Sequence, residues 1–258
     1  MKASASWKTA LAAVAISTAL FSVNAGAQEP HPPHWSYSGD SNPKDWGKLD
    51  PSYSACATGK HQSPIDIKTK EAKPADLPAL QFNYKDAALS VVDNGHTVMV
   101  NYPAGSTLTV GDHVYTLKQF HFHHPSEEHI NGKSHALVAH LVHSDADGHL
   151  VVVAILFDQG ADNAEIDSIW LNIPKEKEKT ADLSSVIINA KDLLPADHGY
   201  FTYSGSLTTP PCTEGVTWYV LRTPSHMSEA EIQAFAKLYP HDNRPIQPLN
   251  GREILESK

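Results

Sequence analysis

The sequence predicts a single domain built mainly from β-strands, with a few short helices at its periphery. Short runs of alternating apolar and polar residues recur along the chain, a pattern typical of strands with one face in a core. Turn signals such as Asn-Gly separate some of these runs. The segment Leu150–Phe157 is apolar throughout, which indicates a strand buried on both faces at the centre of a sheet. No repeat or linker divides the chain, so we expect one domain.

The strands expected before this central segment are joined by hairpin turns. They cover Ala88–Val92, His96–Tyr102, Thr107–Val110 and His113–Lys118, with turns at Asn94-Gly95 and Gly111-Asp112.

Helices are expected at two places after the central segment. A short helix is predicted at Asn163–Trp170. Later, Ser228 and Glu231 form a capping box, followed by apolar residues at helical spacing, namely Ile232, Phe235 and Leu238. Lysine and glutamate alternate in Lys175–Lys179, a pattern that most simply predicts a solvated loop.

The first residues predict export. Lys2 and Lys8 precede an apolar run from about Ala10 to Val23, and small residues at 25–27 follow it. This pattern is typical of a secretory signal peptide, here residues 1–27, and the run is too short for a comfortable transmembrane span. An uncleaved membrane anchor is the alternative. The mature domain is therefore expected at 28–258, periplasmic or secreted, without a membrane span.

The charge of the chain limits its partners. The formal net charge is -9, and removal of residues 1–27 takes away two lysines and no acids, which gives -11. An acidic surface argues against nucleic-acid binding. We expect a small-molecule substrate, and the sequence leaves a monomer and a homodimer both open.

The chain contains two cysteines, Cys56 and Cys212. In an exported protein a disulfide between them is the expected state, and two buried free thiols are the alternative. Closing a loop of this length contributes roughly 3 to 5 kcal/mol in the chain-entropy model.

Three histidines have the spacing of metal ligands. His121 and His123 are two residues apart, so on a strand both rings leave the same face. Asn131-Gly132 predicts a two-residue hairpin turn. Counting outward along an unbroken ladder puts His123 opposite His140 and His121 opposite Val142. Cross-strand partners share a face, so three rings can converge on one ion.

Other histidines gain no such support. His143 has the wrong parity and should point away from the ion. Three neutral histidines without a fourth protein ligand are the arrangement of a catalytic zinc, and zinc bound in this way makes its water a nucleophile near neutral pH. The alternative is a surface cluster that binds stray metal.

Several segments together resemble the α-class carbonic anhydrases, in particular their exported bacterial type. They are 119–123, 125–127, 139–143 and 205–216, extended by 62–67 and 244–250. The resemblance implies the fold of this family, a single domain on a large, mostly antiparallel twisted sheet with a conical cavity that reaches one zinc ion. It also implies a zinc lyase that hydrates carbon dioxide reversibly to bicarbonate and a proton, by attack of zinc-bound hydroxide.

The resemblance assigns roles to individual residues. Thr208 matches the residue that accepts the proton of the hydroxide and donates its own to Glu127, which orients the nucleophile. Hairpin parity independently puts Glu127 on the histidine face and Glu128 on the other. Thr209 lies beside Thr208 on the substrate side. Without the histidines, both threonines would read as part of a turn.

Further residues complete the implied site. His96 matches the proton shuttle, a role suited to a base of pKa near 6.5, with an exposed hairpin histidine as the alternative. Gln119 has the parity to support His121. The carbon dioxide wall would consist of Val142, Val152, Leu207, Val216 and Trp218, for each of which ordinary core packing is the alternative.

Two positions depart from the family pattern. Val138 stands where a glutamate commonly bonds the third ligand, and Glu128 replaces a common histidine. We therefore expect a water, a carbonyl or nothing to orient His140, and tighter zinc binding by a Val138→Glu variant. Two other functions compete: a noncatalytic zinc-holding binding module, and a zinc hydrolase, which would need a glutamate base as in HExxH that is absent here.

Overall fold

The computed structural model describes Met1 and residues 34–258. The expected signal peptide, apart from Met1, lies outside the described residues. No helix in the described part of the chain is long and apolar enough to cross a membrane.

Strands dominate the described chain. They are β1 (Asp66–Ile67), β2 (Lys73–Ala75), β3 (Leu80–Asn83), β4 (Ala87–Asp93), β5 (Val98–Asn101), β6 (Thr107–Val110), β7 (His113–His123), β8 (His129–Ile130), β9 (Lys133–Ser134), β10 (Leu137–Ser144), β11 (Leu150–Gln159), β12 (Lys179–Ile188), β13 (Tyr200–Ser206), β14 (Glu214–Leu221), β15 (Ser225–Met227) and β16 (Leu255–Ser257). The helices are short: α1 (Trp46–Leu49), α2 (Ala55–Thr58), α3 (Ala164–Trp170) and α4 (Glu229–Leu238), with 3₁₀ turns at Gly39–Ser41, Pro51–Tyr53 and Ala190–Leu193.

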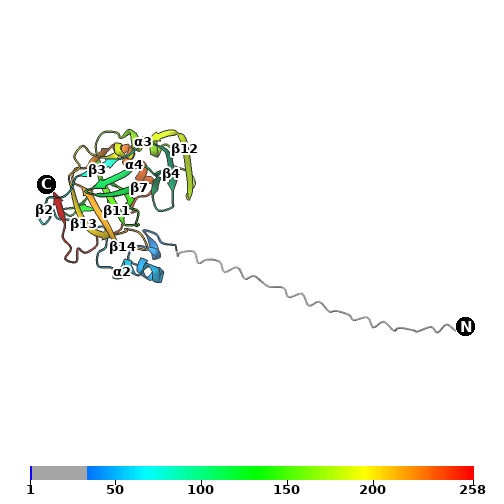
Figure 1. Ribbon diagram of the computed structural model, residues 1–258, viewed down its shortest axis with the longest axis horizontal. Helices are drawn as coiled ribbons and strands as arrows, with labels where there is room; N and C mark the ends of the chain where they lie inside the picture. Colours follow the sequence, from blue (N-terminus) through cyan, green and yellow to red (C-terminus); the bar gives the residue numbers. More distant parts are fainter. Residues whose placement is uncertain (2–33) are drawn as a thin grey trace. The chain divides into compact units, whose positions relative to one another are not determined.

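Most strands belong to one sheet. Ten of them follow one another in the order β12-β4-β5-β7-β10-β11-β14-β13-β16-β2, while β3, β6 and β15 join at the side. The pairs β11–β14, β11–β15 and β16–β2 are parallel, and the others in this sheet are antiparallel. Figure 1 shows α3 and α4 beside each other near β12, and α2 at the other end of the sheet. The predicted mainly β fold on a large, mostly antiparallel sheet is confirmed.

The predicted elements largely recur. β4, β6 and α3 agree with the expected ranges within two residues, and α4 begins at the predicted capping box of Ser228 and Glu231. One strand is shorter than predicted. The hairpin at Asn94-Gly95 has a loop of residues 94–97, because the Asn94 side-chain oxygen accepts the backbone N–H groups of His96 and Thr97. His96 is therefore a loop residue.

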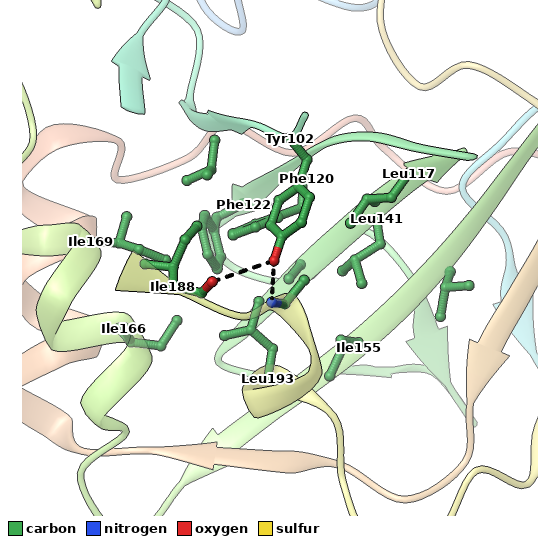
Figure 2. Packing of buried hydrophobic residues seen from close by; sticks show 14 of the residues in the cluster. Tyr102, Leu117, Phe120, Phe122, Leu141, Ile155, Ile166, Ile169, Ile188 and Leu193 are labelled. Atoms are coloured by element: carbon green, nitrogen blue, oxygen red, sulfur yellow. Dashed lines mark hydrogen bonds between the residues drawn. The ribbon is translucent and has the colours of Figure 1, made fainter. Parts of the chain in front are cut away.

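The two faces of the sheet carry two apolar clusters. Alternate residues of β11 belong to different clusters: Val153, Ile155 and Phe157 to the larger, Val152 and Ala154 to the smaller. The prediction of a central strand buried on both faces is confirmed. In Figure 2 the larger cluster surrounds Tyr102, whose hydroxyl accepts the Ala190 N–H at 3.1 Å.

The register predicted between β7 and β10 is wrong by two residues. Asn131 and Gly132 form the expected two-residue turn, and Ile130 opposes Lys133. The ladder is broken farther out, because β8 and β9 leave it and form a separate sheet with β1. The chain takes six steps from His123 to His129 but four from Ser134 to Val138.

As a result, His123 opposes Val138, His140 opposes His121, and Val142 opposes Gln119. Val142 therefore does not oppose His121. Because the shift is even, the paired residues of β7 and β10 stay on the faces that the count gave them.

Candidate metal centre

Strand β7 separates two kinds of side chain. Phe120 and Phe122 are fully buried in the larger cluster, and Figure 2 shows them packed there near Leu117 and Leu141. His121 and His123 leave the opposite face, because side chains alternate along a strand. This face also carries the smaller cluster, through Val138 of the neighbouring β10.

The three histidines lie together on that face. The ring centroids of His121, His123 and His140 are 4.9 to 5.4 Å apart. Each ring offers a nitrogen, and these three atoms all lie within 4.8 Å of one another. His143 lies elsewhere: its Nε2 is 2.8 Å from the Tyr84 hydroxyl, at the larger cluster.

Each ring has one nitrogen next to a hydrogen-bond acceptor. His121 Nδ1 lies 2.8 Å from Gln119 Oε1, and His123 Nδ1 lies 2.6 Å from the Asp242 carbonyl oxygen. His140 Nε2 lies 3.0 and 3.2 Å from the two carboxylate oxygens of Glu128. These acceptors require N–H donors, so the other nitrogen of each neutral ring carries a lone pair.

The free nitrogens fit a metal ion. His123 Nε2 is buried and has no hydrogen-bond partner. Desolvation, reinforced by the nearby rings of His123 and His140, holds the pKa of His121 well below its ordinary value, so this ring is neutral. Three neutral imidazole nitrogens form the donor set of an open zinc site.

Glu127 lies beside the histidines. Its Oε2 is 3.7 Å from His123 Nε2 and 3.8 Å from His140 Nδ1, and this oxygen is buried without a hydrogen-bond partner. Its Oε1 accepts the backbone N–H of Arg244 at 2.7 Å. The carboxylate therefore has one oxygen fixed and one directed at the histidines.

Arg244 is a buried cation that the sequence argument did not single out. Its guanidinium donates to the carbonyl oxygens of Ser63 and Cys56. Burial lowers the pKa of Arg244 to about 10, against an opposing effect of Glu127, and the group stays charged at neutral pH. It supplies a positive charge that compensates the buried carboxylate.

Glu128 is placed differently from the prediction. Hairpin parity assigned its side chain to the face away from the histidines, yet it is fully buried against the His140 ring. Parity fails here because residues 124–128 lie outside any strand. Burial alone would raise the pKa of Glu128, but His140 outweighs it and leaves that pKa below its ordinary value.

This contact also corrects the expectation for Val138. The expectation that only a water, a carbonyl or nothing meets the second nitrogen of His140 is wrong, because a carboxylate, that of Glu128, lies at hydrogen-bond distance from it. A Val138→Glu substitution would bury a second carboxylate beside the first, and like charges there repel. The expected gain in zinc affinity from that single substitution no longer follows.

Asp242 also escaped the sequence argument. Burial raises its pKa well above the usual range, and the Glu127 charge raises it further. Its Oδ1 accepts the His124 backbone N–H at 2.7 Å. Neither Asp242 nor Glu128 carries a local signal, because their partners are far away in sequence or across a broken ladder.

Thr208 and Thr209 follow β13 on a loop that ends at Cys212. Thr208 is buried, and its hydroxyl makes no hydrogen bond to Glu127 among the described residues. A disulfide joins Cys212 to Cys56 in α2, with the two Cα atoms 5.0 Å apart. The side chain of Gln62 donates to the Cys212 carbonyl oxygen at 3.0 Å, so the loop is fixed at its far end.

The five apolar residues expected beside the metal share one cluster. Val152, Val216 and Trp218 are buried in the smaller cluster, and Val142 and Leu207 pack against it. The Trp218 ring lies edge-on to the His140 ring, with centroids 4.9 Å apart. The histidines thus border an apolar surface.

His96 does not touch the three histidines. Its half-buried ring stacks on Trp35, with ring centroids 3.7 Å apart and planes 9° from parallel. Burial, followed by the nearby His34 and Lys177, lowers the pKa of His96 below its ordinary value. The His96 ring is therefore mainly neutral at pH 7 and is able to accept a proton.

A second group of possible ligands is exposed. Asp145, Asp147 and His149 lie together in the loop between β10 and β11. The Asp145 carboxylate already accepts the backbone N–H groups of Asp147 and His149 and faces the His149 ring. The polar groups of this loop are thus hydrogen-bonded to one another, and the cluster is explained without a metal ion.

Comparison with known proteins gives one consistent family. Residues 41–258 match the family model described as eukaryotic-type carbonic anhydrase. The carbonic anhydrase of Neisseria gonorrhoeae is 44% identical over 86% of this chain and 88% of its own length. That of Pectobacterium carotovorum is 45% identical over 86% and 90%. The solved α-carbonic anhydrase of Thermovibrio ammonificans, in complex with sulfanilamide, has a TM-score of 0.84 and 42% identity, over 88% of this chain and 99% of that one.

Proposed function

The chain belongs to the eukaryotic-type carbonic anhydrase family of enzymes that hydrate carbon dioxide, and from this premise we propose that it works with one zinc ion held by His121, His123 and His140. The observation that carries the proposal is that the three rings each offer a nitrogen and that these three nitrogens lie within 4.8 Å of one another. Each opposite nitrogen is bonded to an acceptor. Zinc prefers such a neutral, three-histidine set in catalytic sites.

Zinc, when bound, makes water a nucleophile near neutral pH, an effect for which carbonic anhydrases are the standard example. Glu127 and Thr208 orient that nucleophile. Glu127 Oε2 is a buried acceptor without a partner, so with zinc bound the Thr208 hydroxyl would donate its hydrogen to this oxygen. The threonine oxygen would in turn accept the proton of the nucleophile and so orient one of its lone pairs toward the substrate.

Carbon dioxide binds against the apolar surface beside the histidines. Val142, Val152, Leu207, Val216 and Trp218 supply this surface, with Thr209 at its polar edge. The shared cluster and the contact between Trp218 and His140 support this assignment. Carbon dioxide has only weak hydrogen-bond acceptors and no donor, so an apolar surface is the kind of surface that binds it.

His96 carries the released proton to solvent. A group of pKa about 7 loses its proton to bulk water at only about 10³ per second, if recombination runs near the diffusion limit of about 10¹⁰ per molar per second. A half-buried imidazole at the protein surface supplies a faster acceptor.

The protein acts outside the cytoplasm. The disulfide between Cys56 and Cys212 supports an oxidising compartment. Residues 1–27 serve as the signal peptide and 28–258 as the exported, periplasmic or secreted, domain.

Zinc analysis and stopped-flow carbon dioxide hydration on one purified sample test the proposal. Stoichiometric zinc with rapid hydration is expected. Alanine at 121, 123 or 140 should abolish both, whereas His143→Ala should keep the metal. Zinc without hydration would instead indicate a noncatalytic binding module, and zinc lost only from His143→Ala would overturn the ligand assignment.

A further inference from the structure

Glu128 is a fully buried carboxylate whose two oxygens lie 3.0 and 3.2 Å from His140 Nε2. We propose that Glu128 is the positioning residue that fixes the tautomer and orientation of His140 and thereby tightens the metal site. The inference rests on the proposed zinc function, since it concerns how a zinc ligand is held.

The direction of the hydrogen bond follows from its chemistry. An ionised carboxylate only accepts, so Nε2 must donate. The neutral His140 ring then has its lone pair on Nδ1. This nitrogen lies 3.8 Å from Glu127 Oε2, the same oxygen that lies 3.7 Å from His123 Nε2. Among the described residues, His140 has no other hydrogen-bond acceptor.

The chain segment that carries Glu128 is braced. Ser126 donates its backbone N–H to the His135 carbonyl oxygen, and its hydroxyl donates to the Glu128 carbonyl oxygen at 2.8 Å. The His135 backbone N–H donates to the same hydroxyl at 2.8 Å. The extra residues between β7 and β8 thus form a fixed arm that brings the Glu128 side chain to His140.

The strand that carries His140 offers no substitute. Val138 precedes His140 by two residues on β10, so both side chains leave the same face. Val138 is buried in the smaller apolar cluster and has no acceptor. A carboxylate bonded to a ligating imidazole raises its basicity, and removing it typically weakens metal affinity about 10 to 100-fold.

Four proteins test the inference: the parent, Glu128→Gln, Glu128→Leu, and the exchange Glu128→Val with Val138→Glu. Glutamine keeps an acceptor without the charge, and leucine removes both. The exchange returns a carboxylate to the same face of β10, two residues before His140. Glu165→Gln is the control, because it changes a second buried carboxyl group, one that accepts the Asn189 backbone N–H instead of meeting a histidine.

The first readout is zinc retention against a chelator. We expect about 10-fold weaker retention for Glu128→Gln and about 100-fold for Glu128→Leu. The exchange should recover most of the loss, and Glu165→Gln should match the parent. The second readout is the proton NMR signal of the His140 ring N–H in zinc-loaded protein, which should move upfield in both single variants.

Parental retention in both Glu128→Leu and Glu128→Gln would overturn the inference. So would an unchanged ring N–H signal in the glutamine variant, which has nearly the parental shape and keeps the test valid if leucine or the exchange misfolds. Failure of the proposed zinc function would give a different result, because the parent itself would then hold no zinc.

Discussion

At the scale of single residues, the three rings of the metal centre are held by three kinds of acceptor. Gln119 offers an amide oxygen, Asp242 a main-chain carbonyl and Glu128 a carboxylate. Hydrogen bonds to a charged acceptor are roughly twice as strong as neutral ones. We therefore expect loss of the Glu128 carboxylate to weaken metal affinity more than loss of either neutral acceptor.

Changing Glu127 to glutamine should lower kcat about 100-fold without loss of zinc, because the Thr208 hydroxyl loses its acceptor and the nucleophile its orientation. Stopped-flow hydration with zinc analysis of the same sample checks this. Glu165→Gln serves as control and should keep the parental kcat. A glutamine variant at full kcat would show that Glu127 Oε2 is not the acceptor.

Changing His96 to alanine should slow turnover in weak buffer about 10 to 100-fold, because proton release becomes limiting. Added imidazole should restore much of the rate. His113→Ala, which removes an exposed histidine from the start of β7, should leave the rate unchanged. Parental turnover of His96→Ala in weak buffer would assign the relay to another group.

At the scale of elements, the arm between β7 and β8 decides what the sequence could predict. Side-chain parity along a strand has a period of two, so the common face of His121, His123 and His140 survived a register error of two residues. The error itself was not predictable by counting, since β8 leaves the ladder to pair with β1, far earlier in the chain. For the same reason, the contact between Glu128 and His140 could not be predicted from the sequence.

The loop that carries Thr208 is tied to α2 by its disulfide. Replacing Cys56 and Cys212 by alanine should lower the free energy of unfolding by roughly 3 to 5 kcal/mol, because the unfolded chain regains the entropy of a long open loop. Urea unfolding of parent and variant, both loaded with zinc, measures the difference. The same midpoint for both proteins would contradict this.

At the scale of the whole molecule, fold class and the ligand face were predictable because alternation and turn residues are local signals. Strands β4, β6 and β11 and helix α4 show this. The roles of Asp242 and Arg244 were not, since each meets the site across more than 100 residues of chain. Such contacts depend on tertiary packing, which leaves no periodic mark in a sequence.

Stability should fall as the pH drops from about 6.5 to about 4, partly through His143. Burial lowers the pKa of this ring to about 4, against about 6.5 in an unfolded chain. In this window the unfolded chain binds a proton that the folded protein does not, which costs about 3 kcal/mol at the acid end.

The His143→Gln variant lacks this titration but keeps a polar partner for the Tyr84 hydroxyl. Its unfolding free energy, measured in urea from pH 7 to 4.5, should fall less steeply than that of the parent. Parallel slopes for the two proteins would show that His143 protonates equally in both states.

The acceptors of the three rings come from positions 119, 128 and 242. The metal centre in the middle of the sequence is therefore complete only when the C-terminal part of the chain has docked. Contacts of such long sequence separation form late in folding and make it slow. A chain whose final segment has not yet docked leaves the His123 ring without its carbonyl partner and Glu127 without the Arg244 amide. Metal uptake during refolding should therefore lag behind sheet formation and report the arrival of the C-terminal segment.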